Sequence, residues 1–372
     1  MFRSFLTVSF AILTFVSLSK IVEAQSPDAP KTEAKDARPP LKQCWEYLFQ
    51  NGAGQFVSGF QDKIFVSENE GRLRSISSVS NETIWVSELG GKFAAIIPAE
   101  RIGIFVLSVS SDENNAVSGV LRLIDFNSGL AKYSMPVAFK EPAFLKLAGS
   151  RMIVVSGGGG LEAFDAMSGT AVWKAKSGGR IVSDPAVFES VIAVSNHLKK
   201  IEFFSVIDGS LLTSVSTDRE IKELAFRANQ MLIAGDDRGN VTNFRDQTGA
   251  VWWKFKSGAR IGTIVETDEG ILVGSYDNFV YMISKYSGDV KWKRRLDGRV
   301  IHRPVVVGKE LIFTVSGEED LIVVDSENGK VLEQTSFGDG RFPIADPLLM
   351  DRRILVFPLV GGLAGFSTNG CK

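Results

Sequence analysis

The residue types that usually carry out catalysis are sparse in this chain and poorly spaced for it. The two histidines, His197 and His302, lie far apart, and no His/Cys cluster has the spacing of zinc or iron ligands. The four glycines at 157–160 could form a phosphate-binding loop, but a tight turn between strands explains them more simply. Acidic pairs such as Asp236 and Asp237 could bind a cation, although solvated turns commonly contain them. We predict no catalytic residue, no cofactor and no metal ligand, and therefore a protein that is not an enzyme.

Basic residues, in contrast, recur about every 40 residues along the chain. We call this set the basic ring: Lys92, Lys140, Arg180, Arg219, Arg260, Arg299 and Arg341, with Gln55 at the eighth place. Arginine suits recognition because its planar fork donates to carboxylates and carbonyls. The candidate partner-binding residues are Arg180, Arg260, Arg299 and Arg341. Alternatively, each cation pairs with an acidic turn nearby, which would stabilise little at an exposed site. Those turns contain Glu68, Glu70, Asp236, Asp237, Asp277, Glu318, Glu319 and Asp320.

The basic ring follows a repeat that covers most of the chain. Each repeat has one turn that ends in a residue tolerant of positive φ, as tight hairpins require. These residues are Asn81, Gly129, Gly169, Gly209, Gly249, Gly288, Gly329 and Gly370. A polar insertion at 110–118 lengthens one repeat. Eight such turns predict eight copies of one structural unit.

Each repeat contains four short runs rich in Val, Ile and Phe, and none has a convincing helical period. In one repeat the predicted strands are 181–188, 191–195, 201–206 and 211–215. Four short antiparallel strands in about 40 residues are typical of a propeller blade. The predicted fold is all-β: an eight-bladed β-propeller of four-stranded antiparallel blades.

A large aromatic residue follows most of the turns by four positions. A tryptophan there can pack flat between neighbouring blades and bury a large apolar area, so we predict a structural role. The aromatic residues are Trp85, Tyr133, Trp173, Trp253 and Trp292, whereas Thr213 and Glu333 occupy the place in two repeats.

The two ends of the repeat region complement each other. The last repeat lacks its outer strand, and the run at 44–49 supplies one, with Trp45 at the place of the other tryptophans. The N-terminal strand would then close the ring and leave no open sheet. On this register Cys44 and Cys371 come close, and in an oxidising compartment we expect them to form a disulfide.

The N-terminus has the features of an export signal: Arg3, then an apolar stretch, then small residues before Gln25. We expect a signal peptide at 1–24, a disordered tether at 25–43 and one propeller domain at 44–372; a membrane anchor is the alternative for the apolar stretch. No cysteine lies near the cleavage site, so a lipoprotein is not expected. The formal charge of −1 gives no field that would attract nucleic acid. We expect a monomeric periplasmic or secreted protein with no membrane span in its mature form.

The repeat pattern is complete at 160–174, where the sequence reads GLEAFDAMSGTAVWK. It resembles the PQQ-like repeat of quinoprotein propellers, and among these it looks most like the BamB family of outer-membrane protein assembly factors. The resemblance implies a non-enzymatic, exported scaffold with protein partners in the cell envelope. A secreted propeller that binds a small ligand or glycan is the alternative. The propellers with this kind of repeat also include quinone-dependent dehydrogenases, but those enzymes have a pair of adjacent cysteines that this chain lacks.

Overall fold

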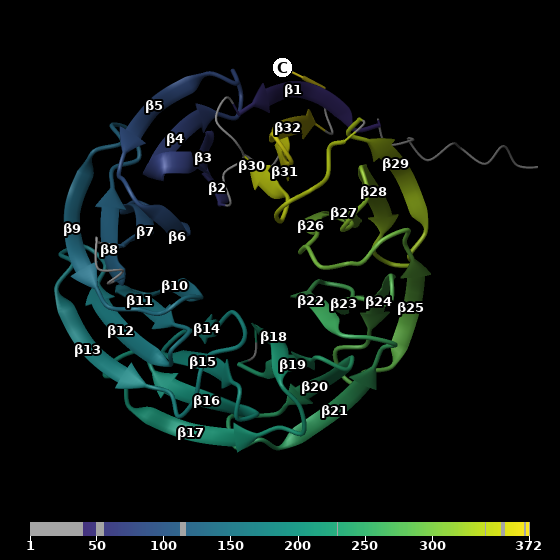
Figure 1. The fold of residues 1–372 in the computed structure, drawn as a ribbon. Helices are drawn as coiled ribbons and strands as arrows, with labels where there is room; N and C mark the ends of the chain where they lie inside the picture. Colours follow the sequence, from purple (N-terminus) through teal and green to yellow (C-terminus); the bar gives the residue numbers. More distant parts are fainter. Residues whose placement is uncertain are drawn as a thin grey trace, which may run out of the picture. The chain divides into compact units, whose positions relative to one another are not determined.

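A computed structural model describes residues 40–49, 56–111, 117–228, 230–338, 340–350, 354–367 and 370–371. In these residues eight four-stranded antiparallel sheets follow one another around a ring, as Figure 1 shows. The predicted eight-bladed propeller is therefore confirmed. The predicted signal peptide, the tether up to residue 39 and Gln55 lie outside the described residues.

Seven blades consist of four consecutive strands, named here from the innermost to the outermost. Blades 1 to 4 contain β2 (Val57–Phe60), β3 (Lys63–Glu68), β4 (Arg72–Ser77) and β5 (Thr83–Glu88); β6 (Lys92–Ala99), β7 (Gly103–Ser111), β8 (Val117–Ile124) and β9 (Ala131–Val137); β10 (Ala143–Ala148), β11 (Arg151–Ser156), β12 (Gly160–Asp165) and β13 (Ala171–Lys176); β14 (Ala186–Phe188), β15 (Val191–Asn196), β16 (Lys200–Ser205) and β17 (Leu211–Ser216). A short 3-10 turn, Asn69–Gly71, joins β3 to β4.

Blades 5 to 7 contain β18 (Ile221–Phe226), β19 (Leu232–Asp236), β20 (Asn240–Phe244) and β21 (Val251–Lys256); β22 (Ile261–Glu266), β23 (Ile271–Ser275), β24 (Phe279–Ile283) and β25 (Val290–Arg295); β26 (Val305–Val307), β27 (Glu310–Thr314), β28 (Asp320–Asp325) and β29 (Val331–Ser336). Blade 8 contains β30 (Leu348–Met350), β31 (Ile354–Leu359), β32 (Gly362–Ser367) and the N-terminal β1 (Lys42–Leu48). The first strand of the propeller thus begins at Lys42.

The innermost strand of blade 4 is shorter than the sequence predicted. Residues 181–188 were expected to be one strand, but β14 starts only at Ala186, and Ile181 forms a single bridge with Asn196. Pro185 has no N–H to donate, so pairing can resume only after it.

Aromatic side chains on the outer strands join each blade to the next. The indole N–H of Trp173 donates to the carbonyl of Val206 at 2.8 Å. Equivalent bonds of 2.8–3.0 Å are made by Trp45, Trp85, Trp253 and Trp292, and by the hydroxyl of Tyr133. In each case the acceptor belongs to the turn between the third and fourth strands of the next blade. In blade 7, Glu333 stands at this place and accepts the backbone N–H of Leu41.

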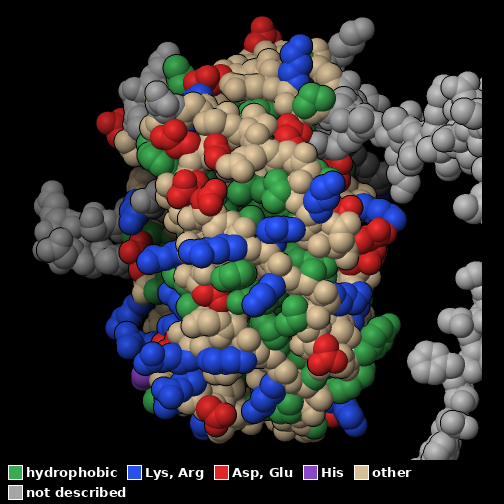
Figure 2. Space-filling model, turned by 90° about the vertical axis from the view of Figure 1, so that its right-hand side faces the viewer, with side chains coloured by type: hydrophobic (Ala, Val, Ile, Leu, Met, Phe, Trp, Pro, Cys, Tyr) green, Lys and Arg blue, Asp and Glu red, His purple; other side chains and the backbone are tan. Residues whose placement is uncertain are grey.

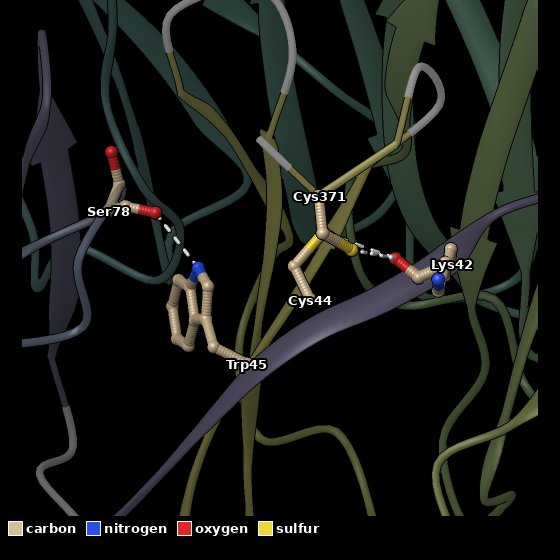
Figure 3. The surroundings of a disulfide bond; sticks show 5 residues. All are labelled: Lys42, Cys44, Trp45, Ser78 and Cys371. Carbon is tan, nitrogen blue, oxygen red and sulfur yellow. Dashed lines mark hydrogen bonds between the residues drawn. A yellow bond between two sulfur atoms is a disulfide. The ribbon is translucent and has the colours of Figure 1, made fainter.

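The N-terminal strand closes the ring by pairing with the C-terminal part of the chain. β1 runs antiparallel to β32, from Lys42 opposite Ser367 to Leu48 opposite Gly362. Beside this pair, Cys44 and Cys371 form a disulfide with their Cα atoms 5.0 Å apart, as Figure 3 shows. Trp45 extends from the same strand to Ser78 in blade 1. None of the described residues forms a helix long and apolar enough to cross a membrane.

Candidate partner-binding surface

The basic ring lies at one end of the propeller, which we call the arginine face. Its loops connect each outer strand to the innermost strand of the next blade: 89–91, 138–142, 177–185, 217–220, 257–260, 296–304 and 340–347. Because the strands within a blade alternate in direction, the turns between second and third strands reach this same end. The opposite end carries the turns between third and fourth strands, which contain Asn81 and the repeated glycines.

Backbone hydrogen bonds show that the seven cations are not all equivalent. In four blades the carbonyl of the basic residue accepts the N–H of the turn between second and third strands, at 2.9–3.0 Å; the acceptors are Lys140, Arg180, Arg260 and Arg299. In blade 5 the acceptor is Glu220, and in blade 8 it is Phe342. Arg219 and Arg341 therefore lie one residue ahead of the others. The offset from the preceding turn residue is 10 in the repeat of Arg219, 12 in that of Arg341 and 11 in the others, so the sequence spacing alone does not show this shift.

Several acidic side chains of this face hold loop backbone rather than the cations of the basic ring. Asp277 accepts the N–H of Gly258 at 2.7 Å, two residues before Arg260. Glu202 accepts the N–H of Gly178 at 3.1 Å, two residues before Arg180. Asp236, Asp277 and Glu319 are occupied in this way by backbone N–H groups. The carboxylates thus fix the loops that carry the arginines.

Burial and a hydrogen bond to Asp277 raise the pKa of the Tyr281 hydroxyl. The hydroxyl donates to Asp277 at 2.7 Å and stays protonated at neutral pH. Asp277 is therefore occupied by Tyr281 as well as by Gly258.

Among the described residues, four ring arginines make no ion pair: Arg180, Arg219, Arg260 and Arg299. Arg260 and Arg299 instead share the ring of Tyr276, with their guanidinium carbons 4.9 and 5.4 Å from its centroid. All four are exposed. The alternative in which every cation pairs with an acidic turn therefore does not describe these four.

Arg341 differs from the other predicted binding residues. Its guanidinium lies 2.5 Å from the Glu46 carboxylate on β1, and its side chain is only 16% exposed. Lys92 also has a partner, since it lies 3.9 Å from Glu141. We therefore assign Arg341 to ring closure and leave it out of the candidate surface, which retains Arg180, Arg260 and Arg299.

Several charged side chains on or beside the innermost strands are paired with one another. Arg303, just before β26, reaches Glu223 on β18 at 2.9 Å and so bridges blades 7 and 5. Lys146 pairs with Asp184 at 2.6 Å. A cavity of about 750 Å³ lies between β6 and β10 and is lined by Lys92, Phe93, Glu141, Lys146 and Asp184, among others. Its two lysines each have a carboxylate partner within the cavity.

No group of three or more potential ligands for a metal ion occurs in the described part of the chain. His197 is occupied by the loop of Arg180, because its Nδ1 accepts the Arg180 N–H at 2.9 Å. Sequence reasoning missed Tyr276, which organises Arg260 and Arg299. No repeated pattern marks Tyr276, because it lies in a turn position that other blades fill with different residues.

A sequence profile that describes the outer membrane protein assembly factor BamB matches residues 134–238 and 237–336, more than half of the chain. An outer membrane protein assembly factor BamB of Moranella endobia is 22% identical over 329 residues, which cover 81% of this chain and 73% of that protein. The BamB of Burkholderia pseudomallei is 20% identical over 363 residues, covering 81% and 92%.

The crystal structure of BamB from Moraxella catarrhalis superposes with a TM-score of 0.67 at 14% identity, covering 88% of this chain and all of that one. At this identity the superposition shows a shared fold alone. The profile match carries the family assignment, and the repeat resemblance predicted from the sequence is confirmed. The chain belongs to the family of the outer membrane protein assembly factor BamB.

Proposed function

We propose that this protein is a non-enzymatic scaffold of the cell envelope that helps to assemble outer-membrane proteins, and that it binds its partners through the arginine face. The observation that carries the proposal is the set of exposed arginines, Arg180, Arg260 and Arg299, on loops fixed by backbone hydrogen bonds. Loops that are already ordered lose little entropy on binding, and arginine is enriched among residues that dominate interfaces.

Two further points support this function. The related proteins from Moranella endobia and Burkholderia pseudomallei are named as outer membrane protein assembly factors. The profile that describes the outer membrane protein assembly factor BamB also matches more than half of this chain.

The test uses cells of the source organism that lack the protein. The wild-type chain should restore the amount of folded outer-membrane barrel proteins, measured by their heat-modifiable mobility on gels. The variant Arg180→Glu/Arg260→Glu/Arg299→Glu should fail to restore it, although its melting curve stays close to that of the wild type because the three side chains make no ion pair. Equal restoration by the triple variant would refute the use of this face.

A small-ligand binder is the second candidate function, and the cavity between β6 and β10 is the feature that would serve it. Pockets of this size commonly hold ligands when a few unpaired polar groups converge in them. Here Lys146 pairs with Asp184 at 2.6 Å, and Lys92 lies 3.9 Å from Glu141. Since these charges are already satisfied, the cavity offers little to orient a ligand, and we favour the scaffold.

A further inference from the structure

Three blades repeat the same arrangement of cations where the outer strand ends. The sequence reads KAKSGGR at 174–180, KFKSGAR at 254–260 and KRRLDGR at 293–299. Two cations stand two residues apart on the outer strand, and an arginine of the basic ring follows four residues later. We call the part in blades 5 and 6 the basic corner: Lys254, Lys256, Arg260, Lys293, Arg295 and Arg299.

The third strand decides whether the outer-strand cations are neutralised. In blade 3, Glu162 lies opposite Lys174 and pairs with it at 3.0 Å. In blade 5 the same register holds Thr242 opposite Lys254, and in blade 6 it holds Tyr281 opposite Lys293. Blades 5 and 6 therefore have the cations of blade 3 without its carboxylate.

The charge is also gathered on one flank of the propeller. β21 and β25 contain five exposed cations and no acidic residue: Lys254, Lys256, Lys291, Lys293 and Arg295. Figure 2 shows Lys and Arg side chains concentrated in the lower half of this flank, whereas acidic side chains are prominent in the upper half. Lysines on sheet edges discourage wrong strand pairing. That role alone does not explain why they are concentrated on two adjacent blades.

From this arrangement we propose that the basic corner binds an extended acidic segment of a partner protein; the inference rests on the proposed scaffold function. Arg260 and Arg299 are held against Tyr276, and a guanidinium stacked on an aromatic ring keeps its N–H groups free for a carboxylate. They would anchor two acidic residues of the segment at the arginine face.

The strands offer the remainder of the site. β21 and β25 each end a sheet, so each pairs on one side only. Their exposed cations alternate, and alternate residues of a strand lie about 6.6 Å apart, a spacing that an extended chain with acidic residues at every second position reproduces. Such a segment would form backbone hydrogen bonds along the free edge of one of these strands, and its carboxylates would contact the exposed lysines of that strand.

The probe is a fluorescent peptide of alternating Glu and Thr, eight residues long, with binding to the full chain measured by anisotropy at low and moderate salt. A peptide of the same composition with its four Glu in one block tests the spacing, and phosphatidylglycerol vesicles test a lipid surface. We expect the alternating peptide to bind at least fivefold more tightly than the block peptide, and more weakly at higher salt. Preference for vesicles over both peptides would overturn the proposal.

Two variants test the residues. Arg260→Ala/Arg299→Ala should weaken binding at least tenfold. Thr242→Glu removes no cation but gives Lys254 the partner that Lys174 has, and it should weaken binding roughly threefold. The matched control is Lys174→Ala/Lys176→Ala, which removes the same number of charges from blade 3 and should change the Kd less than twofold. An equal loss in the control variant would show general attraction to positive charge and would overturn the site.

Failure of this inference can be told from failure of the proposed function. If the peptide does not bind while the triple arginine variant still fails to restore outer-membrane proteins, the basic corner is refuted and the scaffold function stands. If cells that lack the protein have normal outer-membrane proteins, the scaffold function falls whatever the peptide does.

Discussion

Single residues join the blades of this propeller, and the outer-strand tryptophans show it best. Trp173 is 8% exposed and donates its indole N–H to Val206 in the next blade. Trp252 is 36% exposed, and no hydrogen bond of its indole occurs among the described residues. The two side chains differ in burial and hydrogen bonding, so they form a matched pair for mutation.

Trp173→Phe should lower the free energy of unfolding by about 1–2 kcal/mol, because a buried carbonyl loses its donor while most of the ring packing remains. Trp252→Phe should change it by less than about 0.5 kcal/mol. Chemical denaturation monitored by circular dichroism measures both. Equal effects of the two substitutions would mean that the indole hydrogen bond contributes nothing.

The turn glycines allow these tryptophans to lie flat. Gly209 has a φ of +74°, and a Cβ there would meet the Trp173 ring at 2.6 Å. Gly361 has a similar φ of +81°, but a Cβ there meets nothing within 4 Å. The pair separates the cost of positive φ from the cost of steric overlap.

Gly361→Ala should destabilise the protein by about 1 kcal/mol through backbone strain alone. Gly209→Ala should cost about 2 kcal/mol more, since the tryptophan must shift from its packed position. Thermal and denaturant unfolding of the two variants give the comparison. If Gly361→Ala is the more damaging, the packing explanation is wrong.

At the scale of elements, aspartates stabilise the turns between third and fourth strands. Asp125 accepts the backbone N–H groups of Ser128 and Asn127, both at 3.0 Å. These bonds lower the pKa of Asp125 to about 2. Backbone and side-chain bonds from Ser168 likewise lower the pKa of Asp165. The turns thus favour the ionised carboxylate.

The pH dependence follows from the direction of these shifts. An unfolded aspartate has a pKa of about 3.9, so between about pH 4 and pH 2 the unfolded chain binds more protons than the folded one. The stabilisation is complete above this range and is lost as the pH falls through about 2. Asp125→Asn keeps an acceptor oxygen but cannot titrate. Its unfolding free energy should lie below that of the wild type at pH 7, because the ionised carboxylate is lost, and the difference should shrink as the pH falls from about 4 toward 2, as measured by urea unfolding across that range.

The repeat made most elements predictable, because turn residues fix the phase of every strand. The prediction of 201–206, for example, differs from β16 by one residue at each end. The strand prediction failed at 181–185. There the loop before the innermost strand is longer, although the repeat keeps its length of about 40 residues. Arg341 shows the same limit in the basic ring: its sequence phase matches the others, but its partner Glu46 comes from the far end of the chain. Such contacts depend on closure of the ring, which no local pattern encodes.

At the scale of the whole molecule, stability depends on how the first strand is held in the last blade. β1 and Leu41, the residue before it, are held by contacts from three blades. Trp45 and Asn81 link it to blade 1, Arg341 pairs with Glu46 within blade 8, and Glu333 of blade 7 accepts the N–H of Leu41. The two cysteines were predicted to close the ring, and the structure joins them across 327 residues of chain. The disulfide therefore connects the two ends of nearly the whole fold.

Because the disulfide closes so long a loop, its removal should affect the unfolded state strongly. The chain-entropy model gives roughly 4–6 kcal/mol for such a loop, and measured gains are often smaller. Cys44→Ser/Cys371→Ser should therefore lower the free energy of unfolding by about 2–6 kcal/mol, and reductant should have the same effect on the wild type. Hydrogen exchange gives the spatial readout. Amides of β1 and β32 should exchange faster in the variant than in the oxidised protein, by a larger factor than those of β15 in blade 4, which lies on the far side of the ring from the closure. If β1 keeps its protection and the unfolding free energy does not change, the noncovalent contacts of Trp45, Glu46 and Leu41 suffice to close the propeller.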